Sequence, residues 1–254
     1  MQLLGVILFD FFQILKFKIA FMKHLFGFAI SFLLSLQVKS QIENVTALEI
    51  VNRSIDAMGG VEYLRSIKTL YTDTKTTMEG RLVHWIIKEM LPNKGSFQIV
   101  YNNRVVYSDW FDGKKGYSIT NGKKKKTDKD YFKDKLYKKN IINELDYIDS
   151  TLWKLEYLGV EVMGIDTCYK IKGTLVNGLV EVMYFDKSSF HMVRNDKISN
   201  AEKDRYTTYL FSNFKKFDKL VFYTEMKMGE NGSYQLGTIE KLLINQEVEE
   251  SDFN

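Results

Sequence analysis

The stretch VHWIIKEMLPNKGSFQIVYNN (83–103) contains two runs in which apolar and polar side chains alternate, the pattern of half-buried β-strands. Because successive side chains of a strand point to opposite faces, the bulky apolar residues of each run line one face of a sheet. Those residues are Val83, Trp85 and Ile87 in the first run and Phe97, Ile99 and Tyr101 in the second. Asn102-Asn103 ends the second run and readily forms a tight turn. The stretch therefore predicts antiparallel strands joined by hairpins.

Similar runs continue to the end of the chain. Their apolar residues of shared parity are Val182 and Tyr184, followed by Leu220, Phe222 and Met226. Turn signals separate the runs, namely Asp112-Gly113, Asn121-Gly122, Asn177-Gly178 and Asn231-Gly232. We expect about nine to eleven strands, and a twisted antiparallel sheet of that width tends to curl. The sequence thus predicts a mainly β (α+β) fold built on a curved antiparallel sheet.

An amphipathic helix is expected before the strands, over residues 46–58. Thr46 is a suitable N-cap, with Glu49 three residues later. The expected apolar stripe consists of Leu48, Val51, Ile55 and Met58. Gly59-Gly60 ends this helix, and a second short helical turn is expected over residues 61–66.

The segment from Asp128 to Asp149 interrupts the strands. It is charged, lacks Gly and Pro, and carries Phe132, Leu136, Ile142 and Leu145 at roughly helical spacing. We interpret it as one inserted helix or two short ones around which, together with the N-terminal helix, the sheet curves. The insertion could be a fixed plug at one end of the sheet or a movable lid.

The N-terminus has the layout of a secretory signal. After Met22, a short basic start leads into an apolar run that ends at Ser40, so residues 22–40 are predicted to be removed before Gln41. Residues 1–21 are also apolar. They could be an over-extension upstream of the true start, or both stretches could form a membrane anchor. Asp10, Lys16 and Lys18 interrupt the longer run and favour the first account.

The cysteine content and the net charge limit the classes of protein to which this chain can belong. The only cysteine, Cys168, lies far from the signal, so we expect a soluble periplasmic protein without a lipid anchor. The first forty residues hold four of the 36 basic and one of the 32 acidic residues, which leaves 32 basic and 31 acidic residues. Such a balance argues against a nucleic-acid partner. Residues 41–254 are expected to form a single, monomeric domain.

The sequence carries no recognisable catalytic motif. Beyond the signal, its only histidines are His84 and His191, and neither has a second ligand at metal-binding spacing. Nucleophile-elbow, phosphate-loop and dinucleotide motifs are absent. Asp109 and Asp112 are close in sequence, but turn capping is their ordinary role. We therefore expect a non-enzymatic protein without a cofactor or metal.

Positive charge is concentrated in a run of four lysines, Lys123, Lys124, Lys125 and Lys126. These side chains could simply be solvated and discourage edge-to-edge pairing of strands. Alternatively, they could make transient contact with the anionic head groups of a membrane surface.

Six segments together resemble one known family. They are ALEIVNRSIDAMGGVEYLRSIKTL (47–70), WFDGKKGYSI (110–119), GVEVMGIDTCYKIKG (159–173), VEVMYFDKSSFHMVRN (180–195), FSNFKKFDKLVFYTEMKM (211–228) and INQEVEESDF (244–253). In order and spacing they are similar to exported Bacteroidetes proteins related to the outer-membrane lipoprotein-sorting carriers, the LolA and LolB superfamily. The similarity covers essentially all of residues 41–254. Tyr117 departs from the family pattern, which has Trp after the Asp-Gly turn.

The resemblance implies an incomplete barrel around a helical lid, and a carrier that shelters the acyl chains of a lipid or lipoprotein in an apolar cavity. The candidates to line this cavity are Val83, Trp85, Ile87, Phe97, Ile99, Tyr101, Val182, Tyr184, Leu220, Phe222 and Met226. Each of them could equally belong to an ordinary core. The alternative function is therefore a protein-interaction or scaffold module with a filled interior, which the cavity volume would distinguish from a carrier.

Overall fold

The computed structural model describes residues 45–120, 122–128, 131–200, 205–230 and 232–254. The predicted signal (22–40), the segment upstream of it, and the turn residues Asn121 and Asn231 lie outside the described residues. Everything below concerns the compact unit Val45–Asn254.

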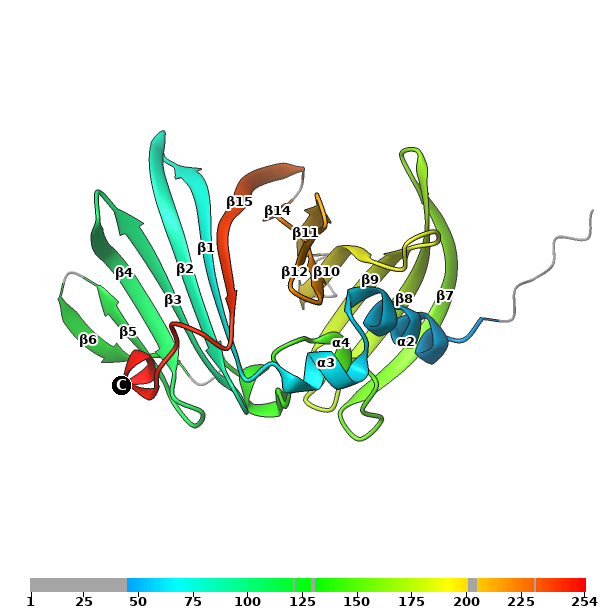
Figure 1. The fold of residues 1–254 in the computed structure, drawn as a ribbon, viewed down its shortest axis with the longest axis horizontal. Helices are drawn as coiled ribbons and strands as arrows, with labels where there is room; N and C mark the ends of the chain where they lie inside the picture. Colours follow the sequence, from blue (N-terminus) through cyan, green and yellow to red (C-terminus); the bar gives the residue numbers. More distant parts are fainter. Residues whose placement is uncertain (1–44, 121, 129–130, 201–204, 231) are drawn as a thin grey trace, which may run out of the picture. The chain divides into compact units, whose positions relative to one another are not determined.

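One large antiparallel sheet dominates the fold (Figure 1). Its thirteen strands are β1 (Thr69–Met78), β2 (Arg81–Met90), β3 (Lys94–Tyr101), β4 (Arg104–Phe111), β5 (Gly116–Thr120), β6 (Lys123–Lys126), β7 (Trp153–Met163), β8 (Asp166–Leu175), β9 (Val180–Asp186), β10 (Met192–Asn200), β11 (Arg205–Ser212), β14 (Glu225–Glu230) and β15 (Ser233–Ile244). Two short strands, β12 (Lys215–Phe217) and β13 (Leu220–Phe222), form a separate hairpin.

The order of the strands explains why the barrel is incomplete. They run β6-β5-β4-β3-β2-β1-β15-β14-β11-β10-β9-β8-β7, so the last strand of the chain joins two groups of hairpins by pairing with β1. Strands β6 and β7 are the two edges, and the sheet does not close between them. The predicted mainly β fold is confirmed, although the main sheet has thirteen strands rather than nine to eleven.

The turn residues act as the sequence predicts. Asn102 and Asn103 both adopt positive φ angles, 47° and 60°, between β3 and β4. Such a pair gives a turn whose twist matches that of the flanking strands. Gly113 and Gly178 also have positive φ at their turns. The turn at Glu79-Gly80, with φ of 50° and 74°, has no Asx residue and was missed in the sequence.

The N-terminal helix, α2 (Ala47–Met58), begins as predicted. The Thr46 hydroxyl accepts a hydrogen bond from the Glu49 backbone N–H at 3.1 Å, which satisfies one of the free donors of the first turn. The buried stripe differs by one position from the expected one, because Leu48 is 49% exposed and Ile50 is fully buried in its place. Gly59 ends the helix with φ 133°, and α3 (Val61–Ser66) follows.

The inserted segment is not a continuous helix. It contains one 3-10 turn, η1 (Lys135–Tyr137), and one helical turn, α4 (Glu144–Tyr147), which is closer to the alternative of two short helices. The carboxylate of Asp146 accepts hydrogen bonds from the backbone N–H of Lys139 and from the Asn140 side chain. Such side-chain-to-backbone bonds compete with helix formation, and here they hold an irregular chain.

In Figure 1, α3 and α4 lie between the lower ends of strands β1–β6 and of strands β7–β9, and α2 lies over the second group, in contact with β7. We call the sheet face that packs against them the inner face. Its buried residues include Leu70, Tyr169, Ile171, Met183, Phe185 and Leu242. The opposite, outer face carries the C-terminal turn η2 (Glu250–Phe253), which is tied to β2 and β3 by the ion pairs Lys88–Asp252 and Lys94–Glu250.

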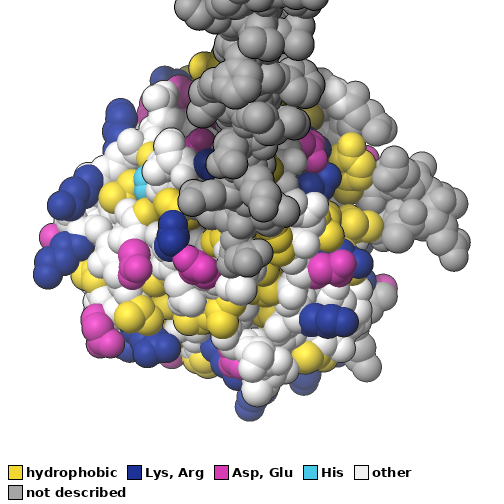
Figure 2. All heavy atoms as spheres, turned by 90° about the vertical axis from the view of Figure 1, so that its right-hand side faces the viewer, with side chains coloured by type: hydrophobic (Ala, Val, Ile, Leu, Met, Phe, Trp, Pro, Cys, Tyr) yellow, Lys and Arg dark blue, Asp and Glu magenta, His cyan; other side chains and the backbone are white. Residues whose placement is uncertain are grey.

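The edge strand β7 carries a mixture of exposed side chains, among them Lys154, Glu156 and Val160. Figure 2 views the molecule from this side, and on its visible part charged and apolar side chains are intermixed. Charges on an edge discourage pairing with another chain. No helix among the described residues is long and apolar enough to span a bilayer.

Candidate functional site

Six of the predicted cavity residues lie together on the inner face. Register places Trp85 opposite Ile99 and Ile87 opposite Phe97, and alternation puts Val83 and Tyr101 on the same face. Val83 and Trp85 are buried, whereas the other four are half-buried.

An aromatic row crosses these strands. The rings of Trp85 and Phe97 are 6.0 Å apart in an edge-to-face arrangement, and Phe97 lies 6.2 Å from Tyr107 on β4. Such pairs stabilise the arrangement beyond the area that they bury. The hydroxyl of Tyr107 donates to buried Asp109, so the polar end of this ring is satisfied.

The apolar inner face continues beyond β1. Met226 lies opposite Gly237 on one side and Phe211 on the other. A Cβ on Gly237 would lie 2.7 Å from Thr74 and 3.8 Å from the Trp85 ring, so glycine leaves room for these side chains. Met226 is half-buried, as predicted for an inner-face position.

The remaining cavity candidates lie elsewhere. Val182 and Tyr184 are on the outer face, because their neighbours Met183 and Phe185 face the helices. Lys170 and Arg194 lie over the ring of Tyr184, at 5.3 and 4.8 Å. The other two are on the separate hairpin, where Leu220 is fully buried in the core and Phe222 is half-buried against it.

The four lid candidates are divided. Ile142 and Leu145 are buried in the core beside α2. Phe132 packs against Phe111 of β4 in a tilted arrangement, with ring centroids 5.4 Å apart, whereas Leu136 is 54% exposed. The insertion thus fixes itself to the sheet at two separate places.

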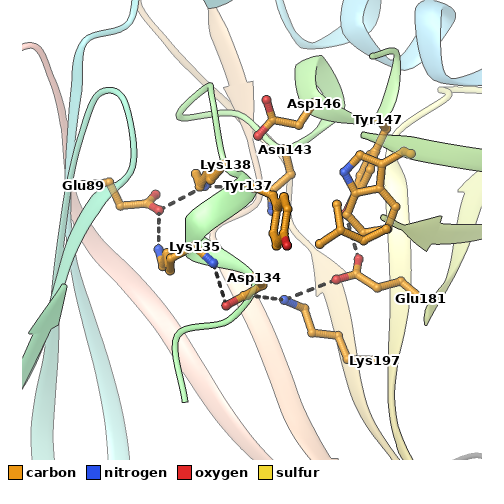
Figure 3. A pocket seen from close by; sticks show the side chains of 12 residues that line it. Glu89, Asp134, Lys135, Tyr137, Lys138, Asn143, Asp146, Tyr147, Glu181 and Lys197 are labelled. Carbon is orange, nitrogen blue, oxygen red and sulfur yellow. Dashed lines mark hydrogen bonds and ion pairs between the residues drawn. The ribbon is translucent and has the colours of Figure 1, made fainter. Parts of the chain in front are cut away.

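Charged side chains fill the part of the inner face nearest to the insertion. We call this cluster the polar plug; it consists of Glu89, Asp134, Lys135, Lys138, Tyr147, Glu181 and Lys197 (Figure 3). At its β2 end, Glu89 accepts from Lys135 at 3.2 Å and from Lys138 at 3.1 Å. Both lysines belong to the insertion, so they connect it to the sheet.

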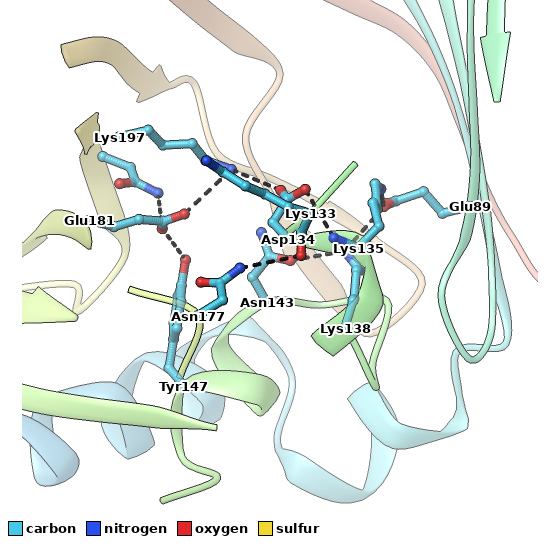
Figure 4. Close-up of polar contacts among 11 residues, drawn as sticks. Glu89, Lys133, Asp134, Lys135, Lys138, Asn143, Tyr147, Asn177, Glu181 and Lys197 are labelled. Atoms are coloured by element: carbon cyan, nitrogen blue, oxygen red, sulfur yellow. Dashed lines mark hydrogen bonds and ion pairs between the residues drawn. The ribbon is translucent and has the colours of Figure 1, made fainter. Parts of the chain in front are cut away.

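The other end of the polar plug is centred on Glu181 of β9 (Figure 4). One oxygen of Glu181 accepts from the Tyr147 hydroxyl at 2.9 Å and from the Asn195 side chain at 2.8 Å. Lys197 lies 3.4 Å from the second oxygen and 3.9 Å from Asp134 of the insertion. The plug is therefore a chain of opposite charges that links β2, the insertion, β9 and β10.

Burial and the pairing of opposite charges determine the pKa values of the ionisable groups in and beside the polar plug. Burial alone would raise the pKa of Glu89, but the ammonium groups of Lys138 and Lys135 outweigh it and lower the pKa to about 2. The charge of Glu181 raises the pKa of Lys197. Burial raises the pKa of Glu144 to about 7, because the opposing effects of a backbone hydrogen bond and of Lys138 are smaller. Glu89 and Lys197 are thus charged at neutral pH, while Glu144 is close to its titration midpoint.

Two small cavities adjoin the polar plug. One, of about 200 Å³, lies among the plug residues themselves. The second, of about 160 Å³, is more apolar and is lined by Met58, Phe214, Phe222, Glu144 and His191, among others. Both are smaller than the ~300–1,000 Å³ of ordinary ligand pockets.

The plug residues were not predicted from the sequence. Their signal was present, because Glu89 has the parity of Val83, Trp85 and Ile87, and Glu181 that of the core residue Met183. A carboxylate at an inward position of a strand requires a partner. The partners come from distant segments, which no local pattern identifies.

Catalytic geometry is not evident in the part of the chain that the structure describes. His84 pairs with Asp73 at 2.7 Å, and His191 stacks on Phe214. Cys168 is buried, and burial raises the pKa of its thiol to about 11. The described residues contain no cluster of three or more potential metal ligands.

The lysine run forms the edge strand β6, and its four side chains are exposed. Lys124 lies over the rings of Trp110 and Tyr117 at 4.9 and 4.6 Å, which are cation–π contacts on the outer face. None of the four lysines has an ion-pair partner among the described residues.

Comparison with known proteins identifies solved structures that have a similar fold. A scan of protein-family models and a search of curated proteins give no match. A solved LolA superfamily protein from Nitrosomonas europaea is similar with a TM-score of 0.56 and 11% identity, over 83% of this chain and 98% of the other. A putative outer membrane lipoprotein-sorting protein domain from Vibrio parahaemolyticus is similar with a TM-score of 0.55 and 16% identity, over 82% of this chain and 95% of the other.

A third solved structure, a DUF1329 family protein from Desulfovibrio piger, gives a TM-score of 0.54 and 14% identity, over 81% of this chain and 95% of the other. At such identities the similarity concerns the fold alone. The chain has a LolA-like fold, as the sequence resemblance implied.

Proposed function

We propose that this protein is an exported, non-enzymatic carrier that binds the acyl chains of a lipid or lipoprotein on the inner face of its sheet. The observation that carries the proposal is the set of half-buried apolar side chains on β2, β3, β11 and β14, all on one face of an open LolA-like sheet. Residues 22–40 would direct export to the periplasm and be removed there, and the carrier would act as a monomer.

The physical basis is apolar burial without polar recognition. Transfer of hydrocarbon out of water contributes about 0.8 kcal/mol per buried methylene and needs no directed group. Side chains such as Phe97, Ile99 and Met226 are half-buried, so each retains surface that an acyl chain can cover. This accounts for a binding face that lacks a sequence motif.

A second function, a scaffold with a filled interior, is favoured by the polar plug. The plug occupies the inner face next to the insertion, and the two cavities beside it, of about 200 and 160 Å³, are too small for an acyl chain. The carrier therefore requires the apolar part of the inner face that lies farther from the plug.

A matched pair of variants separates these functions. Ile99→Asp places a charge on the inner face, and Ile86→Asp places the same charge on the outer face of the neighbouring strand, where Ile86 is also half-buried. The probe is a neutral monoacylglycerol with a brominated chain, which quenches tryptophan on contact.

We expect saturable quenching of the wild type. Ile99→Asp should weaken it at least tenfold, about 1.4 kcal/mol, and Ile86→Asp less than twofold. Thermal melts followed by circular dichroism establish that both variants are folded. Equal effects of the two variants, or no quenching and no co-purified lipid by native mass spectrometry, would reject the carrier in favour of the scaffold.

A further inference from the structure

The strand edge at β5 and β6 contains a cavity that the proposed function does not use. Its volume is about 300 Å³, larger than either cavity beside the polar plug. We call it the edge pocket. It lies where the chain leaves β6 and enters the insertion, and its wall comes from both sides of that junction.

The floor of the edge pocket is apolar. Phe132 packs on Phe111, and Leu136 exposes 54% of its surface beside them. Gly116 makes this packing possible, because a Cβ there would lie 2.1 Å from the Phe132 ring. An exposed leucine at the mouth of an aromatic floor is apolar surface that a ligand can cover.

The rim of the edge pocket is basic. Lys114, Lys115 and Lys126 line it, and none has an ion-pair partner among the described residues. Asp112 holds the first two in place by accepting hydrogen bonds from both of their backbone N–H groups at 2.7 Å. One carboxylate, Asp128, also lines the pocket, so the net formal charge of the lining is +2.

A polar atom inside the pocket is unsatisfied. The Oγ1 hydroxyl of Thr127 is buried and has no hydrogen-bond partner among the described residues. A buried hydroxyl normally finds a partner, because leaving it unpaired costs free energy. A rotation of the Thr127 side chain toward the pocket would let a ligand oxygen accept its hydrogen bond.

We propose that the edge pocket binds a single anionic amphiphile, with its phosphate or carboxylate among Lys114, Lys115 and Lys126 and its hydrocarbon on Phe132 and Leu136. The charge selects an anion, and the apolar floor selects one that carries a chain over a free inorganic ion. This site does not rest on the proposed carrier function, since a scaffold with a filled interior would have the same pocket.

The test uses octyl phosphate at monomeric concentration, measured by isothermal titration calorimetry on protein produced from the full coding sequence. The variant K114Q/K115Q/K126Q should bind it about 100-fold more weakly, since each lysine near an anionic group contributes about a fivefold factor. The control K123Q/K125Q/K216Q removes the same charge from exposed lysines outside the pocket. It should change the affinity less than threefold.

Two further arms identify the ligand. Leu136→Ser should weaken octyl phosphate binding several-fold and leave the weak binding of inorganic phosphate unchanged. Binding to phosphatidylglycerol vesicles measures the general electrostatic attraction of the protein to an anionic surface. Both lysine variants should reduce this binding equally. Equal effects of the two lysine variants on octyl phosphate would overturn the proposal, as would inorganic phosphate binding as tightly as octyl phosphate.

The neutral monoacylglycerol assay keeps the two proposals apart. The edge-pocket variants should leave tryptophan quenching unchanged, and Ile99→Asp should leave octyl phosphate binding unchanged. Thermal melts confirm that each variant is folded before binding is compared.

Discussion

Replacement of Glu144 by glutamine should stabilise the protein at high pH and leave it nearly unchanged at low pH. Glu144 is the first residue of α4 and is only 6% exposed. Burial raises its pKa from 4.5 to about 7, with a smaller opposing effect from Lys138. In the native state the carboxyl therefore keeps its proton over a pH range in which the unfolded chain has lost it.

The direction and size of the effect follow from this difference. Between pH 4.5 and about 7 the native state binds more protons than the unfolded state, so the free energy of unfolding falls as pH rises. The native and unfolded pKa values of Glu144 differ by about 2.5 units. At 1.36 kcal/mol per unit, the free energy of unfolding of the wild type falls by about 3 kcal/mol by pH 8. Glutamine has nearly the same shape and no proton to lose.

Urea denaturation at pH 5, 6, 7 and 8 measures the effect. We expect Glu144→Gln to exceed the wild type by less than about 1 kcal/mol at pH 5 and by about 3 kcal/mol at pH 8. Glu62→Gln, at an exposed position of α3, is the control and should change the free energy of unfolding by less than about 0.5 kcal/mol. A stability difference for Glu144→Gln that is constant from pH 5 to pH 8 would refute the reasoning.

Three further predictions concern other parts of the chain. Glu89→Gln should destabilise the protein by about 3 kcal/mol at pH 7, because the pKa of Glu89 is lowered from 4.5 to about 2, and the loss should vanish as the pH falls from 4.5 to 2 in the same urea assay. Gly116→Ala should cost about 1–3 kcal/mol by overpacking against Phe132, and the cost should shrink in a Phe132→Ala background; an unchanged cost would show that another contact is responsible. N-terminal sequencing of the exported protein should begin at Gln41, and a mature chain that begins upstream of Met22 would contradict the predicted signal.

The sequence predicts local features well, because local physics determines them. The N-cap at Thr46, the hairpin turns and the inward parity of β2 and β3 all depend on residues within a few positions of one another. Strand β9, VEVMYFD, shows where this fails. Both of its parities contain apolar side chains, so periodicity cannot tell which face is buried, and Val182 and Tyr184 were placed on the wrong side.

The polar plug could not be predicted from the sequence for a different reason. Lys138 meets Glu89 across 49 positions, and Tyr147 meets Glu181 across 34. Helical spacing in the insertion predicted one inserted helix or two short ones, whereas these distant polar contacts and the backbone bonds to Asp146 favour an irregular chain. Tertiary contacts thus override local propensity where charges are buried.

Under the proposed function, the polar plug also constrains how an acyl chain can lie. Along β2 the apolar inner face runs from Val83 to Ile87, about 14 Å at ~3.4 Å per residue, before Glu89 begins the plug. One leaflet of a ~30 Å hydrocarbon core is about 15 Å, so a chain along the strand would reach the charges. Across the strands, from Tyr107 on β4 to Phe211 on β11, six spacings of ~4.8 Å give about 29 Å of largely apolar surface. The crosswise path accommodates a whole chain while the ion pairs of Glu89 stay intact, so binding does not require the insertion to leave the sheet.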